Sequence, residues 1–97
     1  MKVKDIMDQM EHVNVEGIIA SKSDRGVINT RFGGANFAKA VLADETGEIT
    51  LNLWREQTEV KVGDRVRIEN GFAKFHELNV GRRGRIIIIK ESPKDRI

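Results

Sequence analysis

Residues 44–54 read DETGEITLNLW and show the clearest alternation of apolar and polar residues in the sequence. One face of an extended chain would carry Ile49, Leu51 and Leu53. The other face would carry Thr50, Asn52 and Trp54. A period of two predicts a strand over residues 48–54. The Asp-Glu-Thr-Gly stretch at 44–47 predicts a compact turn, because Asp hydrogen-bonds its own backbone and Gly reaches positive φ. The segment is therefore the return half of a β-hairpin.

Further segments on both sides of this hairpin show strand-like patterns and are separated by Gly or Asp. We expect strands at 12–21, 36–43 and 65–75, and a last strand at 77–80 and 85–90 that is interrupted by Gly81-Arg82-Arg83-Gly84. Gly17 is expected to bend the first strand or to form a bulge. Residues 55–59 predict a short helical turn. The apolar spacing in residues 1–10 predicts a short N-terminal helical segment.

Five strands with one helical turn between the third and the fourth form the element order of an OB-fold, an all-β, five-stranded Greek-key barrel. An SH3-like barrel is the alternative, but it lacks the long connection between strands three and four. The 97 residues are expected to form one OB domain spanning 1–97, because a second unit would be too small to sustain a core. Residues 92–97 are polar and are expected to fray.

Composition excludes several classes of protein. Hydrophobic residues are 39% and charged residues 33%, which fits neither a disordered chain nor a membrane protein. No apolar run approaches the roughly 20 residues that cross a bilayer, and the N-terminus lacks the apolar stretch of a signal peptide. The sequence contains no Cys, which excludes disulfides and thiolate metal sites. We expect a cytoplasmic protein without a membrane partner.

Charge is unevenly distributed along the chain. Residues 1–60 contain 7 basic and 10 acidic residues, whereas residues 61–97 contain 10 basic and 5 acidic residues. Such a basic half is compatible with a surface that binds polyanions. A solvated face explains it equally well, so charge alone does not decide the function.

An enzyme is not expected. His12 and His76 are the only imidazoles, Tyr is absent, and no Ser has a His or Asp neighbour at a recognisable spacing. Asp44 and Glu45 are adjacent and would point apart, so they indicate a solvated turn and not a carboxylate pair. We expect neither catalysis nor a metal or other cofactor.

The stretch Gly81-Arg82-Arg83-Gly84 has the GXXG form that clamps a nucleic-acid backbone in KH domains. In KH domains that loop joins two helices, whereas here its flanks are rich in β-branched residues, which excludes a KH domain. Arg82 and Arg83 remain candidates for phosphate contacts. The alternative is a hairpin tip with no further role.

The aromatic residues favour a nucleic-acid-binding face. Trp54 shares its face with polar residues, so it needs a partner or a cover. Phe72 continues the inward phase of the preceding strand unless Gly71 introduces a bulge, and at least one of Phe72 and Phe75 must point outward. Aromatic rings beside Arg and Lys allow bases to stack and phosphates to be neutralised without sequence preference. A Trp that caps one end of the core is the alternative.

Several of these segments together resemble a known family over most of the chain. They are Asn14-Val15, the DETG turn followed by LNLW at 51–54, Val62-Gly63-Asp64, and RIENGF at 67–72. This combination resembles the single-OB-fold, single-stranded-DNA-binding proteins of archaea and their eukaryotic relatives in DNA-damage sensing, which are akin to replication protein A.

The resemblance implies roles for individual residues. In that family the Trp after the hairpin and two aromatics near the loop between strands four and five stack on bases, which implies the same for Trp54, Phe72 and Phe75. The basic glycine-containing stretch implies phosphate contacts from Arg82 and Arg83. We expect the interface to include the polar and basic neighbours Asn52, Arg67, Lys74 and Asn79.

The expected function is binding of single-stranded DNA with little sequence preference in replication, recombination or repair, by a nucleoid-associated monomer that could recruit protein partners. RNA is an alternative ligand, because stacking and phosphate contacts do not select the sugar. A second alternative is a protein-interaction OB domain, in which Trp54 and the isoleucines at 86–89 bury against a partner chain.

Overall fold

Strands make up most of the computed structural model, which describes residues 1–24 and 26–92. The elements in chain order are η1 (Val3–Asp5), β1 (Val13–Lys22), β2 (Gly26–Thr30), β3 (Gly33–Asp44), β4 (Gly47–Trp54), η2 (Arg55–Glu59), β5 (Arg65–Lys74), β6 (Glu77–Asn79) and β7 (Arg85–Lys90). The two η elements are short 3₁₀ turns, and η2 covers the residues for which a helical turn was predicted. The expected all-β class is confirmed.

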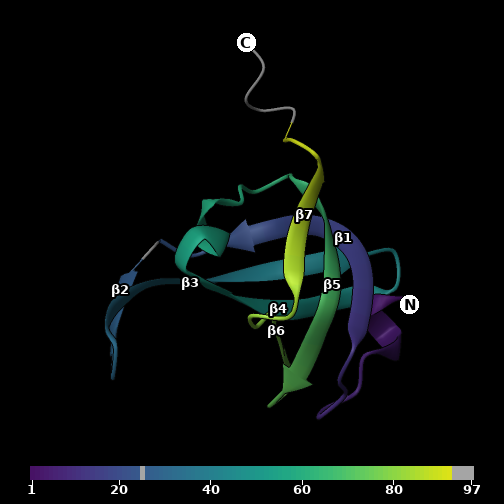
Figure 1. Cartoon of the computed structure of the whole chain (residues 1–97). Helices are drawn as coiled ribbons and strands as arrows, with labels where there is room; N and C mark the ends of the chain where they lie inside the picture. Colours follow the sequence, from purple (N-terminus) through teal and green to yellow (C-terminus); the bar gives the residue numbers. More distant parts are fainter. Residues whose placement is uncertain (25, 93–97) are drawn as a thin grey trace.

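Five strands close into a barrel in the order β1-β3-β4-β6-β5, and β5 returns to β1 (Figure 1). The β4–β6 contact is parallel and the other contacts are antiparallel. The predicted last strand is divided into β6 and β7, which both pair with β5. This is the barrel that the element order predicts, with two additional strands.

The barrel interior is filled by alternate residues of the strands. Leu51 and Leu53 of β4 are fully buried, as the alternation predicts. The other large side chains with no exposed surface are Val13, Ile19, Leu42, Val66, Ile68 and Leu78. Burial of each such side chain contributes about 1.5–3 kcal/mol to folding. The core thus fixes which face of each strand remains outside.

Gly17 does not form the expected bulge. The register between β1 and β3 shifts between Ile19 and Ser21, three residues further along. Gly17 is needed for a different reason, because a Cβ at this position would lie 2.6 Å from the carbonyl oxygen of Ala43. The close approach of two strands requires glycine there.

Residues 26–34 lie between two of the expected strands, and they form most of a two-stranded arm. In this arm β2 pairs with the first residues of β3, and the arm extends away from the barrel (Figure 1). The Thr30 hydroxyl donates to the carbonyl oxygen of Gly33 at 2.7 Å, and Gly33 closes the turn with a φ of 106°. The β-branched residues Val27 and Ile28 were a signal for this strand.

The chain after β7 is anchored at Ser92. This residue is buried, and its N–H donates to Oδ1 of Asp64 at 2.7 Å. Ser92 therefore differs from the frayed tail expected over 92–97, and residues 93–97 lie outside the described residues.

Candidate nucleic-acid interface

A bulge in β5 turns Phe72 toward the outside of the barrel. Residues 13–15 of β1 oppose residues 68–71 of β5, so that β5 carries one additional residue. Asn70 takes up this residue with a φ of 55°, a left-handed conformation that Asn tolerates better than most residues. Gly71 is consequently buried and Phe72 is 38% exposed. The outward direction of Phe72 follows from the bulge at Asn70, one residue before the glycine that sequence analysis considered.

Phe75 occupies the tip of the β5–β6 hairpin. Lys74 pairs with Glu77, which leaves Phe75 and His76 as a two-residue turn with φ values of 54° and 60°. Such turns favour Asn and Gly, because other side chains are strained in this conformation. Phe75 is 77% exposed, and the Lys74 ammonium lies 5.5 Å from the centre of its ring. The hairpin thus presents a large apolar ring where a small polar residue would be more stable.

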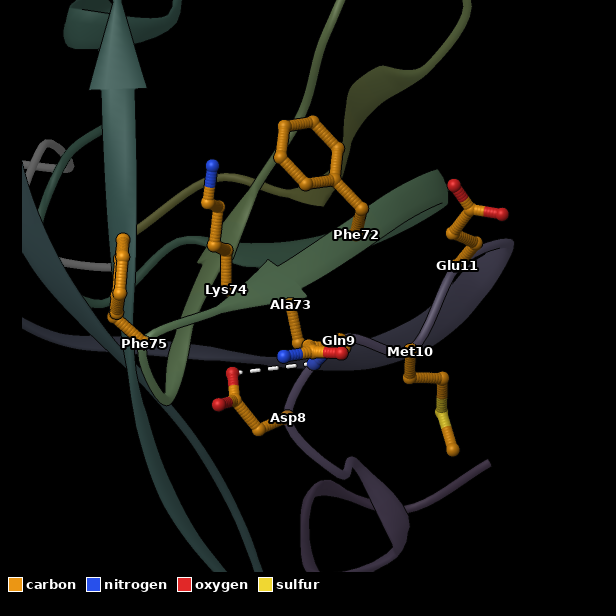
Figure 2. A pocket seen from close by; sticks show the side chains of 8 residues that line it. All are labelled: Asp8, Gln9, Met10, Glu11, Phe72, Ala73, Lys74 and Phe75. Carbon is orange, nitrogen blue, oxygen red and sulfur yellow. Dashed lines mark hydrogen bonds between the residues drawn. The ribbon is translucent and has the colours of Figure 1, made fainter.

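Both phenylalanines line a surface pocket of about 280 Å³ (Figure 2). The N-terminal segment 8–11 forms its other wall. It is held there by two backbone groups, since Ala73 N–H donates to the Met10 carbonyl at 2.8 Å and His76 N–H donates to Asp8 Oδ1 at 3.1 Å. Asp8 and Glu11 give this wall negative charge, whereas Lys74 lies on the β5 side of the pocket.

Trp54 ends β4 on the same outer side of the sheet as Asn52. It pairs with Phe37 of β3, and the two ring centres lie 4.5 Å apart at an interplanar angle of 57°. The backbone of Trp54 is held by Gln57 of η2, whose Oε1 accepts the Trp54 N–H at 3.0 Å. Phe37 was missed by sequence analysis, although its alternation with the buried Ala38 could have identified it. The ring pair leaves Trp54 partly exposed.

Polar side chains lie beside this ring pair on β3, β4 and β6. Lys39 Nζ donates to both carboxylate oxygens of Glu77, at 3.0 and 2.9 Å. Asn52 Nδ2 donates to Glu77 Oε1 at 3.0 Å and to Asn79 Oδ1 at 3.1 Å. The hydrogen bonds from Lys39 and then Asn52 lower the pKa of Glu77 below its ordinary value. We call Lys39, Asn52, Glu77 and Asn79 the polar cluster. Of the predicted residues, Asn52 and Asn79 therefore meet, but Asn52 is only 7% exposed.

Arg82 and Arg83 are exposed in the turn between β6 and β7. This turn and Phe72 line one surface pocket of about 420 Å³. Asn70 Nδ2 donates to the Arg83 carbonyl at 3.2 Å, so the bulge that directs Phe72 also holds the turn. A Cβ on Gly84 would lie 2.6 Å from the Asn70 carbonyl oxygen, which explains the glycine. The structure thus brings both arginines close to Phe72.

Arg67 is not brought to this group. Its guanidinium lies 3.9 Å from a carboxylate oxygen of Glu16 on β1 and 3.9 Å from one of Glu69. These acids and Arg65 form a series of ion pairs across β1 and β5. The register that places Glu16 beside Arg67 is a tertiary feature, so sequence analysis could not foresee that this charge is already paired.

The β2–β3 arm adds apolar surface that sequence analysis also missed. Ile28 pairs with Ala35, and Gly26 pairs with Phe37, so Ile28 shares the face of Phe37. Phe32 at the turn is 84% exposed. The apolar part of the outer face therefore continues from the barrel onto the arm.

The described residues contain no group of three or more His, Asp or Glu side chains arranged to hold a metal ion. No helix in the part of the chain that the structure describes could span a membrane. The closed barrel carries exposed rings, a basic turn and a polar cluster on one side. These features define an OB-fold domain with a ligand-binding surface.

Comparison with known proteins agrees with this class. No family model matches the sequence. The chain is 38% identical over 96 residues to replication factor A of Methanothermobacter thermautotrophicus, covering 90% of this chain and 12% of that protein. It is 32% identical over 90 residues to the single-stranded DNA binding protein Ssb of Saccharolobus solfataricus, covering 88% of this chain and 61% of that protein.

Solved structures show the same fold. A domain of replication protein A from Methanococcus maripaludis has a TM-score of 0.78 at 23% identity and covers 94% of this chain and 96% of its own. An OB domain from Thermoplasma acidophilum has a TM-score of 0.78 at 24% identity and covers 92% of this chain and 85% of its own. The chain is an OB domain homologous to archaeal replication factor A and Ssb. Neither of these two relatives is named as an enzyme, in agreement with the expectation of a binding module.

Proposed function

We propose that this domain binds single-stranded DNA during replication, recombination or repair, with bases stacked on aromatic side chains and phosphates contacted by arginines. The carrying observation is that Phe72 and Phe75 are turned outward by a bulge and a strained turn, and that Phe72 lies beside an arginine-containing turn. Exposing two large rings has no benefit for folding. Stacking of a base on such a ring contributes about 1–3 kcal/mol.

The proposed contacts follow from exposure and charge. Trp54, Phe72 and Phe75 would stack on bases, and Arg82, Arg83 and Lys74 would approach phosphates. Asn52 and Asn79 would act through the polar cluster. Arg67 is not part of the proposed set, because its charge is paired with Glu16 and Glu69. The names of the relatives, replication factor A and single-stranded DNA binding protein, support DNA as the ligand.

Fluorescence of the single Trp tests this proposal. We expect oligo(dT) to quench Trp54 at low salt, and added salt to restore the signal as counterions compete for the phosphate contacts. Anisotropy of a labelled oligo(dT) is measured in parallel, so that binding away from Trp54 is also detected. Absence of both signals would exclude the proposed function. Equal affinity for oligo(U) would extend it to RNA.

A protein contact through β7 is the second candidate function. Within the described residues β7 pairs with β5 and with no other strand, so one of its edges is open. Ile88 and Ile89 are 44% and 42% exposed, on opposite faces of this strand. Open, apolar strand edges are sites of chain association. Size-exclusion chromatography with light scattering would distinguish the monomer that we propose from self-association.

A further inference from the structure

A carboxylate lies within the proposed DNA-binding face, where it would repel phosphates. Glu77 is on β6, between Thr50 of β4 and Lys74 of β5. Its side chain is 33% exposed. A surface that used only rings and cations would bind DNA more strongly without this negative charge. The carboxylate therefore needs a purpose other than phosphate binding.

The hydrogen bonds of Glu77 leave one acceptor position open. A carboxylate oxygen has two lone pairs. Oε1 accepts from Lys39 and Asn52, both at 3.0 Å, whereas Oε2 accepts only from Lys39, at 2.9 Å, among the described residues. The Lys39 ammonium has three N–H groups and directs two of them at Glu77. The Lys39–Glu77 pair thus offers a donor and an acceptor side by side.

Asn52 holds this pair in a defined orientation. Its amide donates to both Glu77 and Asn79, and the reversed amide would direct an oxygen at two acceptors. Asn52 Oδ1 is buried and has no hydrogen-bond partner among the residues that the structure describes. An unsatisfied buried oxygen is destabilising, so the cluster retains it at a cost in stability. Asn52 is a positioning residue for Glu77.

A donor beside an acceptor is the complement of a Watson–Crick base edge, where an acceptor and a donor also lie side by side. Cytosine presents its N4 amino donor next to the N3 acceptor, and carboxylates accept hydrogen bonds from cytosine N4. Thymine also presents a donor, N3–H, beside an acceptor, O4, but a second carbonyl oxygen, O2, flanks that N–H and repels a carboxylate that accepts from it. Stacking and phosphate contacts do not distinguish these two pyrimidines strongly.

We propose that Lys39 and Glu77 contact the Watson–Crick edge of one stacked base and favour an amino-bearing base over thymine. This inference rests on the proposed function, since it requires single-stranded DNA on this face. It adds a preference at one base position to binding that otherwise depends on stacking and charge.

The test compares short oligo(dC) and oligo(dT) by anisotropy at neutral pH and constant salt. The wild-type protein should bind oligo(dC) about fivefold or more tightly than oligo(dT), the lower end of the range for one good base contact. Glu77→Gln should reduce this ratio to about one. Glu16→Gln is the matched control, because it removes the same charge from an exposed ion pair on β1, and it should leave the ratio unchanged.

The outcomes distinguish failure of the base contact from failure of the proposed function. A wild-type protein that binds both oligonucleotides equally, or an unchanged ratio in Glu77→Gln, would overturn the base contact and leave the proposed function intact. A wild-type protein that binds neither would overturn the proposed function itself. Thermal unfolding of both variants verifies that they are folded, and the wild-type ratio tests the inference even if Glu77→Gln does not fold.

Discussion

At the scale of single residues, the turn at Phe75 and His76 has a strained backbone and presents an exposed ring. Both are held at positive φ, where a residue with a side chain is strained by about 1–2 kcal/mol. We expect His76→Gly to increase the free energy of unfolding by an amount of this order and to leave DNA affinity unchanged, since Phe75 is retained. Phe75→Asn should also stabilise the protein but should weaken binding by about 1–3 kcal/mol.

Urea unfolding and oligonucleotide anisotropy on the same preparations check this pair of variants. Full affinity in Phe75→Asn would exclude Phe75 as a stacking residue. Reduced affinity in His76→Gly would instead show that turn geometry, and not the ring alone, matters for binding.

Trp54 combines a binding and a packing role, because its ring contacts Phe37. Trp54→Ala should weaken binding of oligo(dT) by about 1–3 kcal/mol. It should also lower stability by about 1 kcal/mol through loss of the aromatic contact. Binding is measured by anisotropy and stability by urea unfolding. Unchanged affinity together with a large loss of stability would assign Trp54 to the core alone.

At the scale of elements, the bulge in β5 decides the direction of Phe72. Asn70→Gly keeps access to the left-handed conformation and loses only the side-chain hydrogen bonds to His12 and Arg83. Asn70→Val loses both, so it should be less stable than Asn70→Gly by about 1–2 kcal/mol. Chemical denaturation of the two variants checks the difference. Equal stabilities would mean that the backbone at residue 70 is not constrained.

Substitutions in the turn between β6 and β7 should change the salt dependence of DNA binding without changing protein stability. Each phosphate contact on a single strand contributes about −0.7 to the slope of log K against log salt, so Arg82→Ala with Arg83→Ala should flatten the slope by about 1.4. Stability should change by less than about 0.5 kcal/mol, since both side chains are exposed. The slope is obtained from titrations at several salt concentrations. If it is unchanged in the double variant, these arginines do not neutralise phosphates.

At the scale of the whole molecule, Asp44 connects the N-terminal segment to the β3–β4 hairpin. Its carboxylate accepts from the Thr46 hydroxyl at 2.5 Å and from the N–H groups of Val3 at 2.8 Å and Thr46 at 2.7 Å. The pKa of Asp44 is lowered from 3.8 to about 2. The largest contribution is the hydrogen bond from the Thr46 hydroxyl, followed by the hydrogen bonds from the backbone N–H groups of Val3, Thr46 and Gly47.

The direction of the pH dependence follows from this lowered pKa. A carboxylate with a lower pKa in the folded state stabilises the protein fully above its unfolded pKa and loses that contribution as the pH falls through the folded value. We expect Asp44→Asn to be less stable than the wild type at neutral pH, and the difference to shrink between about pH 4 and pH 2. Urea unfolding across this range measures it. A constant difference would show that the charge of Asp44 is not involved.

Local patterns in the sequence determined the elements. Alternation over 48–54, the Asp44 turn and the helical turn at 55–59 depend on residues close together in the chain, and each was confirmed at or within a residue of its predicted bounds. Because these elements occur in a characteristic order, the OB barrel could also be predicted. The outward position of Trp54 opposite Leu53 follows from the same alternation.

Only the tertiary structure decided how the surface is composed. The additional residue at Asn70, the pairing of Trp54 with Phe37 and the hydrogen bonds of Asn52 to Glu77 all depend on the register between strands that are distant in sequence. The same register places Glu16 opposite Arg67, so the charge of Arg67 is paired and Arg67 is not part of the candidate interface. A shift of one residue moves a side chain to the opposite face of a strand, and which shift occurs is set by packing of the whole barrel.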